Sequence, residues 1–222
     1  MKPPYSLALL TDPPTWRGTA LSGRPLDLLA VLAASPQTRV SDDILIEALW
    51  PDDVPARPLR ALHVVVSRVR AVVGEGVVER LGDGYRLALP AAQIDVCDLA
   101  DRAERARTRA VEGQWDQVLV LTGSLPQVPA HCEAGDAVGA GPAPLSRLRE
   151  RAVALAEAAR CDRGLALEAT GEHERAAELL REAAQRDAGD EIVLAALMRA
   201  ESWAHSPAAA LEIYEQYRRR LR

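Results

Sequence analysis

Arginine side chains gathered between residues 57 and 72 are the groups in this sequence best suited to recognise a charged partner. Arg57, Arg60, Arg68 and Arg70 lie there without a single acidic residue between them. Guanidinium groups donate paired hydrogen bonds to phosphate oxygens and to the edge of guanine. The net charge of the chain is −5, so its overall charge does not attract nucleic acid. Any nucleic-acid site must therefore be a local patch.

Helical spacing divides the same segment into two faces. One side is predicted to be buried, and its members are Leu59, Leu62, Val66, Val69 and Val73. The opposite side is predicted to be exposed, with flanking arginines at its two edges: Arg57, Arg60, His63, Val64, Ser67, Arg68 and Arg70. This layout is typical of a recognition helix, whose central side chains contact bases and whose edges contact phosphates. The alternative is an arginine-rich helix face that only contacts water.

The elements expected around this helix follow the order of a winged helix-turn-helix. Two short strands at about 5–10 and 15–21 precede helices at 26–34, 42–49 and 58–73. A β-hairpin at 77–89 follows, and its Gly82-Asp83-Gly84 turn is flanked by Arg80 and Arg86. We expect both arginines to contact DNA from the wing.

Only helices are predicted beyond this hairpin, at 95–112, 115–123, 145–170, 173–186, 190–203 and 207–221. A loop rich in glycine and proline occupies 124–144. A faint repeat of 34 residues, the tetratricopeptide period, relates 171–180 to 205–214. The predicted fold class is mainly α with small β: a winged helix-turn-helix domain at 1–92, then an all-α tetratricopeptide-like domain at 93–222.

Signals for other chemistry are weak. Three widely spaced cysteines favour a reduced, cytoplasmic protein without disulfides, and no Cys/His cluster has the spacing of a metal site. Residues 135–141 (GDAVGAG) lack the Lys-Ser/Thr of a phosphate loop. No nucleophile lies beside a base. We therefore predict no enzyme, cofactor, metal or membrane segment, and we interpret Trp50, Trp115 and Trp203 as core residues.

Three segments together resemble the Streptomyces antibiotic regulatory proteins. They are residues 46–53 (IEALWPDD), 61–70 (ALHVVVSRVR) and 82–87 (GDGYRL). That family joins an OmpR-type winged helix, the effector domain also found in two-component regulators, to a helical bacterial transcriptional activator domain. The chain departs from the family at Val65, where histidine is usual, and at Ala71, where a basic residue is usual.

The resemblance implies a cytoplasmic activator of a secondary-metabolite or antibiotic gene cluster. It implies binding of double-stranded DNA at tandem promoter repeats as a homodimer, and recruitment of RNA polymerase through its sigma factor and alpha subunit. Contacts with polymerase would come from Trp50, Asp52 and Asp53. Two alternatives stay open: the N-terminal part of a larger ATP-dependent regulator that continues beyond Arg222, and a helical-repeat adaptor whose winged helix does not bind DNA.

Overall fold

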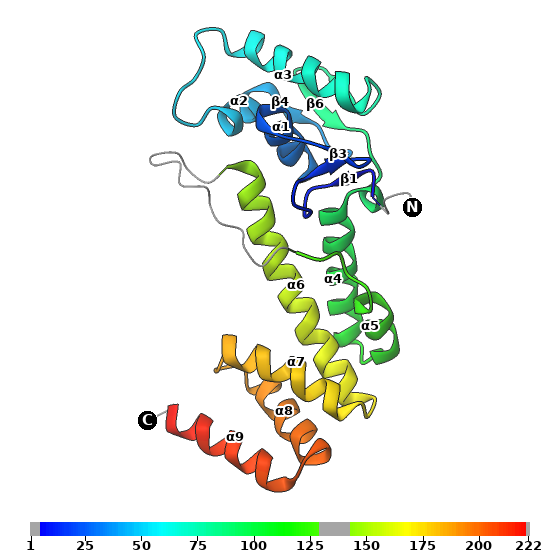
Figure 1. Cartoon of the computed structure of the whole chain (residues 1–222), viewed down its shortest axis with the longest axis vertical. Helices are drawn as coiled ribbons and strands as arrows, with labels where there is room; N and C mark the ends of the chain where they lie inside the picture. The colour runs from blue at the N-terminus through cyan, green and yellow to red at the C-terminus, as the bar shows by residue number, and fades with distance from the viewer. Residues whose placement is uncertain (1–4, 129–142, 221–222) are drawn as a thin grey trace. The chain divides into compact units, whose positions relative to one another are not determined.

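The computed structural model describes residues 5–128 and 143–220 and forms two compact units (Figure 1). The first unit contains residues 1–100 and 126–153, and the second contains residues 101–125 and 154–222. Residues 135–141, which the sequence excludes as a phosphate loop, lie outside the described residues. The functional division at residues 92 and 93 stays a prediction.

Two small antiparallel sheets and three helices build most of the first unit. One sheet has the order β1-β2-β3, with bounds Leu7–Ala8, Thr15–Trp16 and Thr19–Ala20. The other has the order β4-β6-β5, with bounds Val40–Ser41, Gly84–Leu87 and Val78–Leu81. The helices are α1 (Gly23–Ala33), α2 (Asp42–Leu49) and α3 (Pro58–Val73). This is the predicted winged helix-turn-helix, with β5 and β6 as its wing.

Local sequence signals explain where the second and third helices start and stop. The Ser41 hydroxyl accepts a hydrogen bond from the Ile44 amide at 3.5 Å and caps α2. Pro58 occupies the first turn of α3, where a missing amide hydrogen costs nothing. Gly74 ends α3 with φ 98°, a value that glycine adopts without strain.

The core of the first unit lies between these helices and the wing. α1 packs against α2, α3 and β6. The fully buried side chains that form this core are Leu28, Leu29, Leu32, Leu45, Leu49, Leu62, Val69 and Leu87. Burial of these leucines and valines fixes the orientation of α3, because each contributes about 1.5–3 kcal/mol relative to an exposed position.

A buried carboxylate ties the N-terminal strand to the first helix after the wing. A 3-10 turn at Ala91–Gln93 leads into α4 (Asp95–Val111). Asp95 is 3% exposed and accepts hydrogen bonds from the amides of Leu9, Leu10 and Val96 at 2.8–2.9 Å. Burial nevertheless raises the pKa of Asp95, with the three amides opposing that shift.

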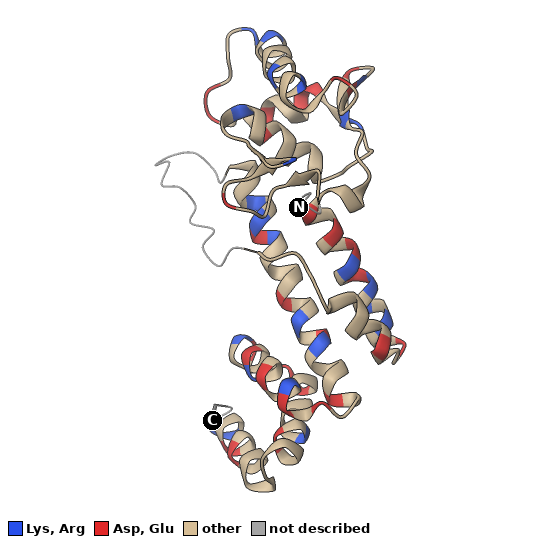
Figure 2. Ribbon diagram, turned by 45° about the vertical axis from the view of Figure 1, so that its right-hand side comes forward, with Lys and Arg blue, Asp and Glu red and all other residues tan. Residues whose placement is uncertain are grey.

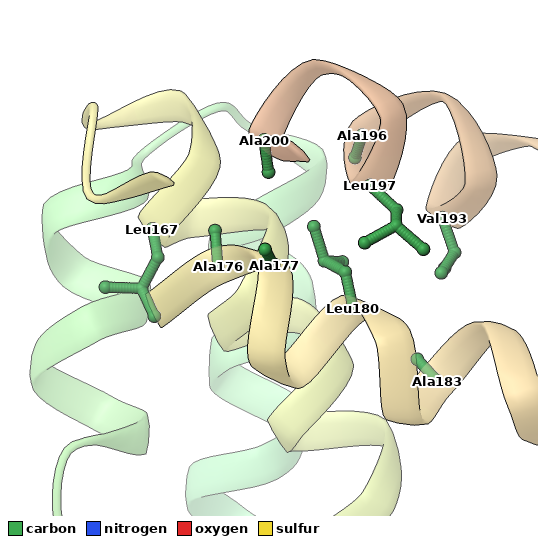
Figure 3. Packing of buried hydrophobic residues seen from close by; sticks show 9 residues of the cluster. All are labelled: Leu167, Ala176, Ala177, Leu180, Ala183, Val193, Ala196, Leu197 and Ala200. Carbon is green, nitrogen blue, oxygen red and sulfur yellow. The ribbon is translucent and has the colours of Figure 1, made fainter. Parts of the chain in front are cut away.

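The described residues of the second unit form helices and the turns between them. The helices are α5 (Trp115–Thr122), α7 (His173–Arg186), α8 (Glu191–Ala204) and α9 (Pro207–Arg220), while α4 and α6 (Pro144–Ala169) contribute residues to both units. Figure 3 shows the core where α6, α7 and α8 meet, formed by Leu167, Ala176, Ala177, Leu180, Ala183, Val193, Ala196, Leu197 and Ala200. Alanines at these contacts let the helix backbones approach closely.

The helical domain after the winged helix is confirmed, but one tryptophan departs from its prediction. Trp50 and Trp115 are half-buried, whereas Trp203 is 76% exposed and stacks on His173 with ring centroids 5.9 Å apart. Its prediction as a core residue is wrong, because Trp203 lies near the end of α8, beyond Ala200, where its ring stacks on His173 at the start of α7 and stays open to solvent. The tetratricopeptide likeness stays a prediction.

Within 5–128 and 143–220, no helix is both long enough and apolar enough to cross a membrane. Over the same ranges, His, Cys, Asp and Glu side chains form no group of three or more that could hold a metal ion.

Candidate nucleic-acid interface

The third helix presents one apolar face and one polar face, as its spacing predicts. Its buried side chains are Leu62, Val65, Val66, Val69 and Val73. Compared with the predicted face, the buried arc is rotated toward Val65, which is 5% exposed, and away from Leu59, which is 52% exposed. The prediction was wrong for Leu59. Val65 points into the core, so the departure from the family's histidine there removes no exposed group.

Unpaired polar groups cover the exposed face of α3. The side chains of Arg57, Arg60, His63, Ser67 and Arg68 are exposed and make no hydrogen bond or ion pair within the described part of the chain. Val64 lies among them at 46% exposure. Figure 2 shows basic residues along this helix. These donors are therefore free to bind an external acceptor.

The other three predicted DNA contacts are occupied within the fold. Arg70 donates from Nε to the Val78 carbonyl at 2.9 Å. Arg80 donates from both terminal nitrogens to the Asp42 carboxylate, each at 2.8 Å. Arg86 donates to Glu79 at 2.7 and 2.9 Å. Their role as direct DNA contacts stays a prediction, and the structure gives each a partner of its own.

A buried tyrosine connects α3 with the wing. The guanidinium of Arg80 lies 4.7 Å from the centre of the Tyr85 ring, and that of Arg70 lies 5.8 Å from it. Tyr85 is 4% exposed. Hydrogen bonds to Asp42 raise the pKa of Arg80. This cluster of Asp42, Arg70, Arg80 and Tyr85, hereafter the wing clamp, holds the wing against α2 and α3.

An open groove lies between α3 and the wing. Its volume is about 620 Å³, and it is lined by His63, Val66, Ser67, Arg70, Ala71, Glu75, Arg80 and Tyr85. Of the two arginines in its lining, Arg80 is ion-paired with Asp42, whereas, within the described part of the chain, Arg70 donates only to a backbone carbonyl. The groove thus continues the exposed face of α3 toward the wing.

The segment between α2 and α3 exposes acidic and apolar groups. Asp52 and Asp53 are exposed, and Val54 is 54% exposed. Trp50 is half-buried, with the Arg24 guanidinium 5.7 Å from its ring centre. The proposed polymerase contacts are therefore available at the surface, with Trp50 less so than the two aspartates.

Reasoning from the sequence missed two residues that shape this interface. Asp42 lies in the first turn of α2 and is also the ion-pair partner of Arg80, 38 residues away. Gly84 looked like a turn glycine, yet a Cβ there would lie 2.2 Å from the Val40 carbonyl oxygen. A two-residue strand such as β4 carries too little pattern to have predicted either contact.

Known proteins that are similar to this chain are regulators of transcription or carry the name of regulatory proteins. Residues 17–87 match the family model described as "Transcriptional regulatory protein, C terminal". The chain is 32% identical over 100 residues to regulatory protein AfsR of Streptomyces griseus. This alignment covers 41% of this chain and 10% of that protein. It is 34% identical over 101 residues to AfsR of Streptomyces coelicolor, covering 42% of this chain and 10% of that protein.

A solved structure shares the fold. Mycobacterium tuberculosis EmbR, in complex with a low-affinity phosphopeptide, matches with a TM-score of 0.71 at 23% identity, over 98% of this chain and 60% of that one. The order of elements is that of a winged helix-turn-helix joined to a helical domain, and residues 17–87 of the family match include its three helices. Over these segments the chain is similar to transcriptional regulators, among them AfsR of two Streptomyces species. The alignment spans only a tenth of those curated relatives.

Proposed function

We propose that this chain is a sequence-specific DNA-binding activator of transcription that uses α3 as its recognition helix. The observation that carries the proposal is the exposed face of α3, where arginine, histidine and serine donors have no hydrogen-bond or ion-pair partner among residues 5–128 and 143–220. An unpaired arginine row on a fixed helix is suited to a major groove, because the groove is lined by acceptors and flanked by phosphates.

We expect the proposed contacts to have two roles. Arg60, His63, Val64 and Ser67 lie toward the middle of the exposed face and would contact base edges, with the Val64 methyls suited to a thymine methyl group. Arg57 and Arg68 would contact phosphates. Arg70, Arg80 and Arg86 would mainly hold the wing in position, since each already has a partner in the fold.

Activation would follow from contacts made beside the DNA. Exposed Asp52 and Asp53, with Trp50, would contact the sigma factor or alpha subunit of RNA polymerase. Two copies would bind adjacent promoter repeats as a homodimer in the cytoplasm. The resemblance of residues 46–53, 61–70 and 82–87 to the Streptomyces antibiotic regulatory proteins favours a secondary-metabolite gene cluster as the target. The spacing of the repeats would be close to one helical turn of DNA.

Two substitutions on α3 test the division of roles. A binding site is first selected from random duplexes, and affinities for it and for random DNA are measured by fluorescence anisotropy over a salt series. Arg60→Ala should weaken binding to the selected site by about 1–3 kcal/mol and binding to random DNA much less. Arg68→Ala should weaken both and reduce the salt slope by about one unit.

A matched control and a clear negative result complete this test. Arg160 is exposed on α6 in the second unit, so Arg160→Ala makes the same change of charge away from α3. It should leave both affinities unchanged. If no duplex is selected, or if Arg68→Ala and Arg160→Ala behave alike, α3 does not bind DNA. The chain would then be an adaptor, which its net charge of −5 and its paired wing arginines favour.

A further inference from the structure

A second groove, in the helical unit, has no part in the proposed DNA contacts. It has a volume of about 320 Å³ and is lined by residues of α7, α8, α9 and the α7–α8 turn. In Figure 1, α7 and α9 lie on either side of α8, which agrees with the packing of α8 against both neighbours. The volume is at the lower end of the range for small-ligand sites, so it accommodates a few side chains rather than a folded domain.

The floor of the groove is apolar. It is formed by Ala184, Ala188, Leu194, Leu197, Ala209 and Ile213. Leu197 is 3% exposed and belongs to the core in Figure 3, whereas Leu194 and Ile213 are only half-buried. Apolar surface that remains partly open to water in a concave site favours binding of an apolar side chain.

Acidic groups dominate the charge of the groove. Its one arginine, Arg181, is ion-paired with Glu201, which is 5% exposed. Asp187 and Glu212 also line the groove, and neither has a basic partner within the described residues. Two uncompensated carboxylates therefore border an apolar floor, so the groove attracts a cationic ligand.

We propose that this groove binds a short peptide segment of a partner protein that carries leucine-sized side chains next to lysine or arginine. The apolar side chains would fill the space over Leu194 and Ile213, and the basic side chain would pair with Glu212 or Asp187 at the edge. Gln185 and Gln216 also line the groove and could hydrogen-bond the peptide backbone. This proposal does not depend on DNA binding by the first unit.

The test uses a library of phage-displayed random 12-residue peptides, selected on the immobilised full chain. We expect enrichment of peptides that combine Leu, Ile or Met with Lys or Arg. Synthetic copies should bind at least tenfold more weakly to Glu212→Lys and should lose affinity as salt rises, because the contact is electrostatic at the exposed edge. Circular dichroism and DNA binding of Glu212→Lys should match the unchanged chain, which separates this result from misfolding and from failure of the proposed function.

Glu182→Lys is the matched control. Glu182 is exposed on α7, does not line the groove and undergoes the same reversal of charge. It should alter peptide affinity less than twofold. Enrichment of acidic peptides, no enrichment at all, or equal losses in both variants would overturn the proposal. A concentration-dependent dimer in sedimentation that Glu212→Lys dissociates would also overturn it, since the groove would then be covered by a second copy.

Discussion

Loss of the wing clamp's carboxylate gives the most direct test of how this winged helix is held together. Asp42→Asn keeps the size of the side chain but removes the charge that accepts two hydrogen bonds from Arg80 at 2.8 Å. The Asp42 side chain is 10% exposed and that of Arg80 is 39% exposed. The interaction therefore lies between a buried ion pair and a surface one.

The expected magnitude follows from that intermediate position. Breaking a fully buried pair costs about 3–5 kcal/mol and an exposed pair about 0–1 kcal/mol, so solvent at Arg80 should reduce the loss to about 1–2 kcal/mol. Asp42 also begins α2, where a negative charge contributes about 0.3–1 kcal/mol through the helix dipole. Asp43→Asn is the matched control for this second effect, because Asp43 is exposed in the same first turn.

The assay is urea unfolding followed by tryptophan fluorescence. Trp16 and Trp50 lie in the first unit, so replacing Trp115 and Trp203 by phenylalanine lets the signal report on that unit alone. Asp42→Asn should lower the free energy of unfolding by about 1 kcal/mol more than Asp43→Asn does. Combination with Arg80→Gln should show a coupling energy of about 1 kcal/mol.

Equal losses from the two aspartate variants would refute this reasoning. The ion pair would then contribute nothing beyond the helix dipole. Full additivity of Asp42→Asn and Arg80→Gln would refute it as well, because two residues that interact directly cannot contribute independently.

Three further outcomes are expected. Gly84→Ala should destabilise the first unit by about 1–3 kcal/mol, since the added Cβ would meet the Val40 carbonyl, and a lower melting temperature would show it. Leu180→Ala should cost about 2–5 kcal/mol in urea unfolding because Leu180 is fully buried; a loss below 1 kcal/mol would contradict its place in the core. In a variant with Cys132 changed to serine, Cys97 and Cys161 should react slowly with a disulfide reagent at pH 8 until urea is added. The reason is that burial raises their thiol pKa values to about 12 and about 11. Prompt reaction of the folded chain would exclude this explanation. Both pKa values exceed the ordinary thiol value of 9.0, so each thiol ionises more readily in the unfolded chain than in the folded one. The contribution of the two buried thiols to the free energy of unfolding should therefore be complete below pH 9 and lost as the pH rises through about 11 to 12.

Local signals allowed the helices to be predicted closely. Ser41, Pro58 and Gly74 mark the starts or ends of α2 and α3, and these residues act through contacts within one turn. The repeated spacing of valines predicted which side of α3 is buried, within the rotation toward Val65. Information of this kind is contained in the neighbouring sequence itself.

Contacts between distant residues could not be predicted in the same way. Arg80 was expected at the DNA because it flanks the glycine-rich turn of the wing, and nothing within its strand indicates a carboxylate 38 residues earlier. Trp203 was expected in the core because it ends an amphipathic helix, but it lies beyond Ala200 at the end of α8 and stacks on His173 with most of its surface exposed. Burial of a given side chain is decided by the neighbouring element, which one sequence does not specify.

The separation between scaffold and contact surface on α3 has an evolutionary consequence. Arg60, His63, Val64 and Ser67 make no hydrogen bond or ion pair in the described chain, while the buried valines and the wing clamp hold the helix in place. Substitutions at such unpartnered surface positions usually change stability by less than about 0.5 kcal/mol. A new operator preference can therefore arise by mutation at these positions without loss of the fold, and related regulators can diverge in their targets while keeping one architecture.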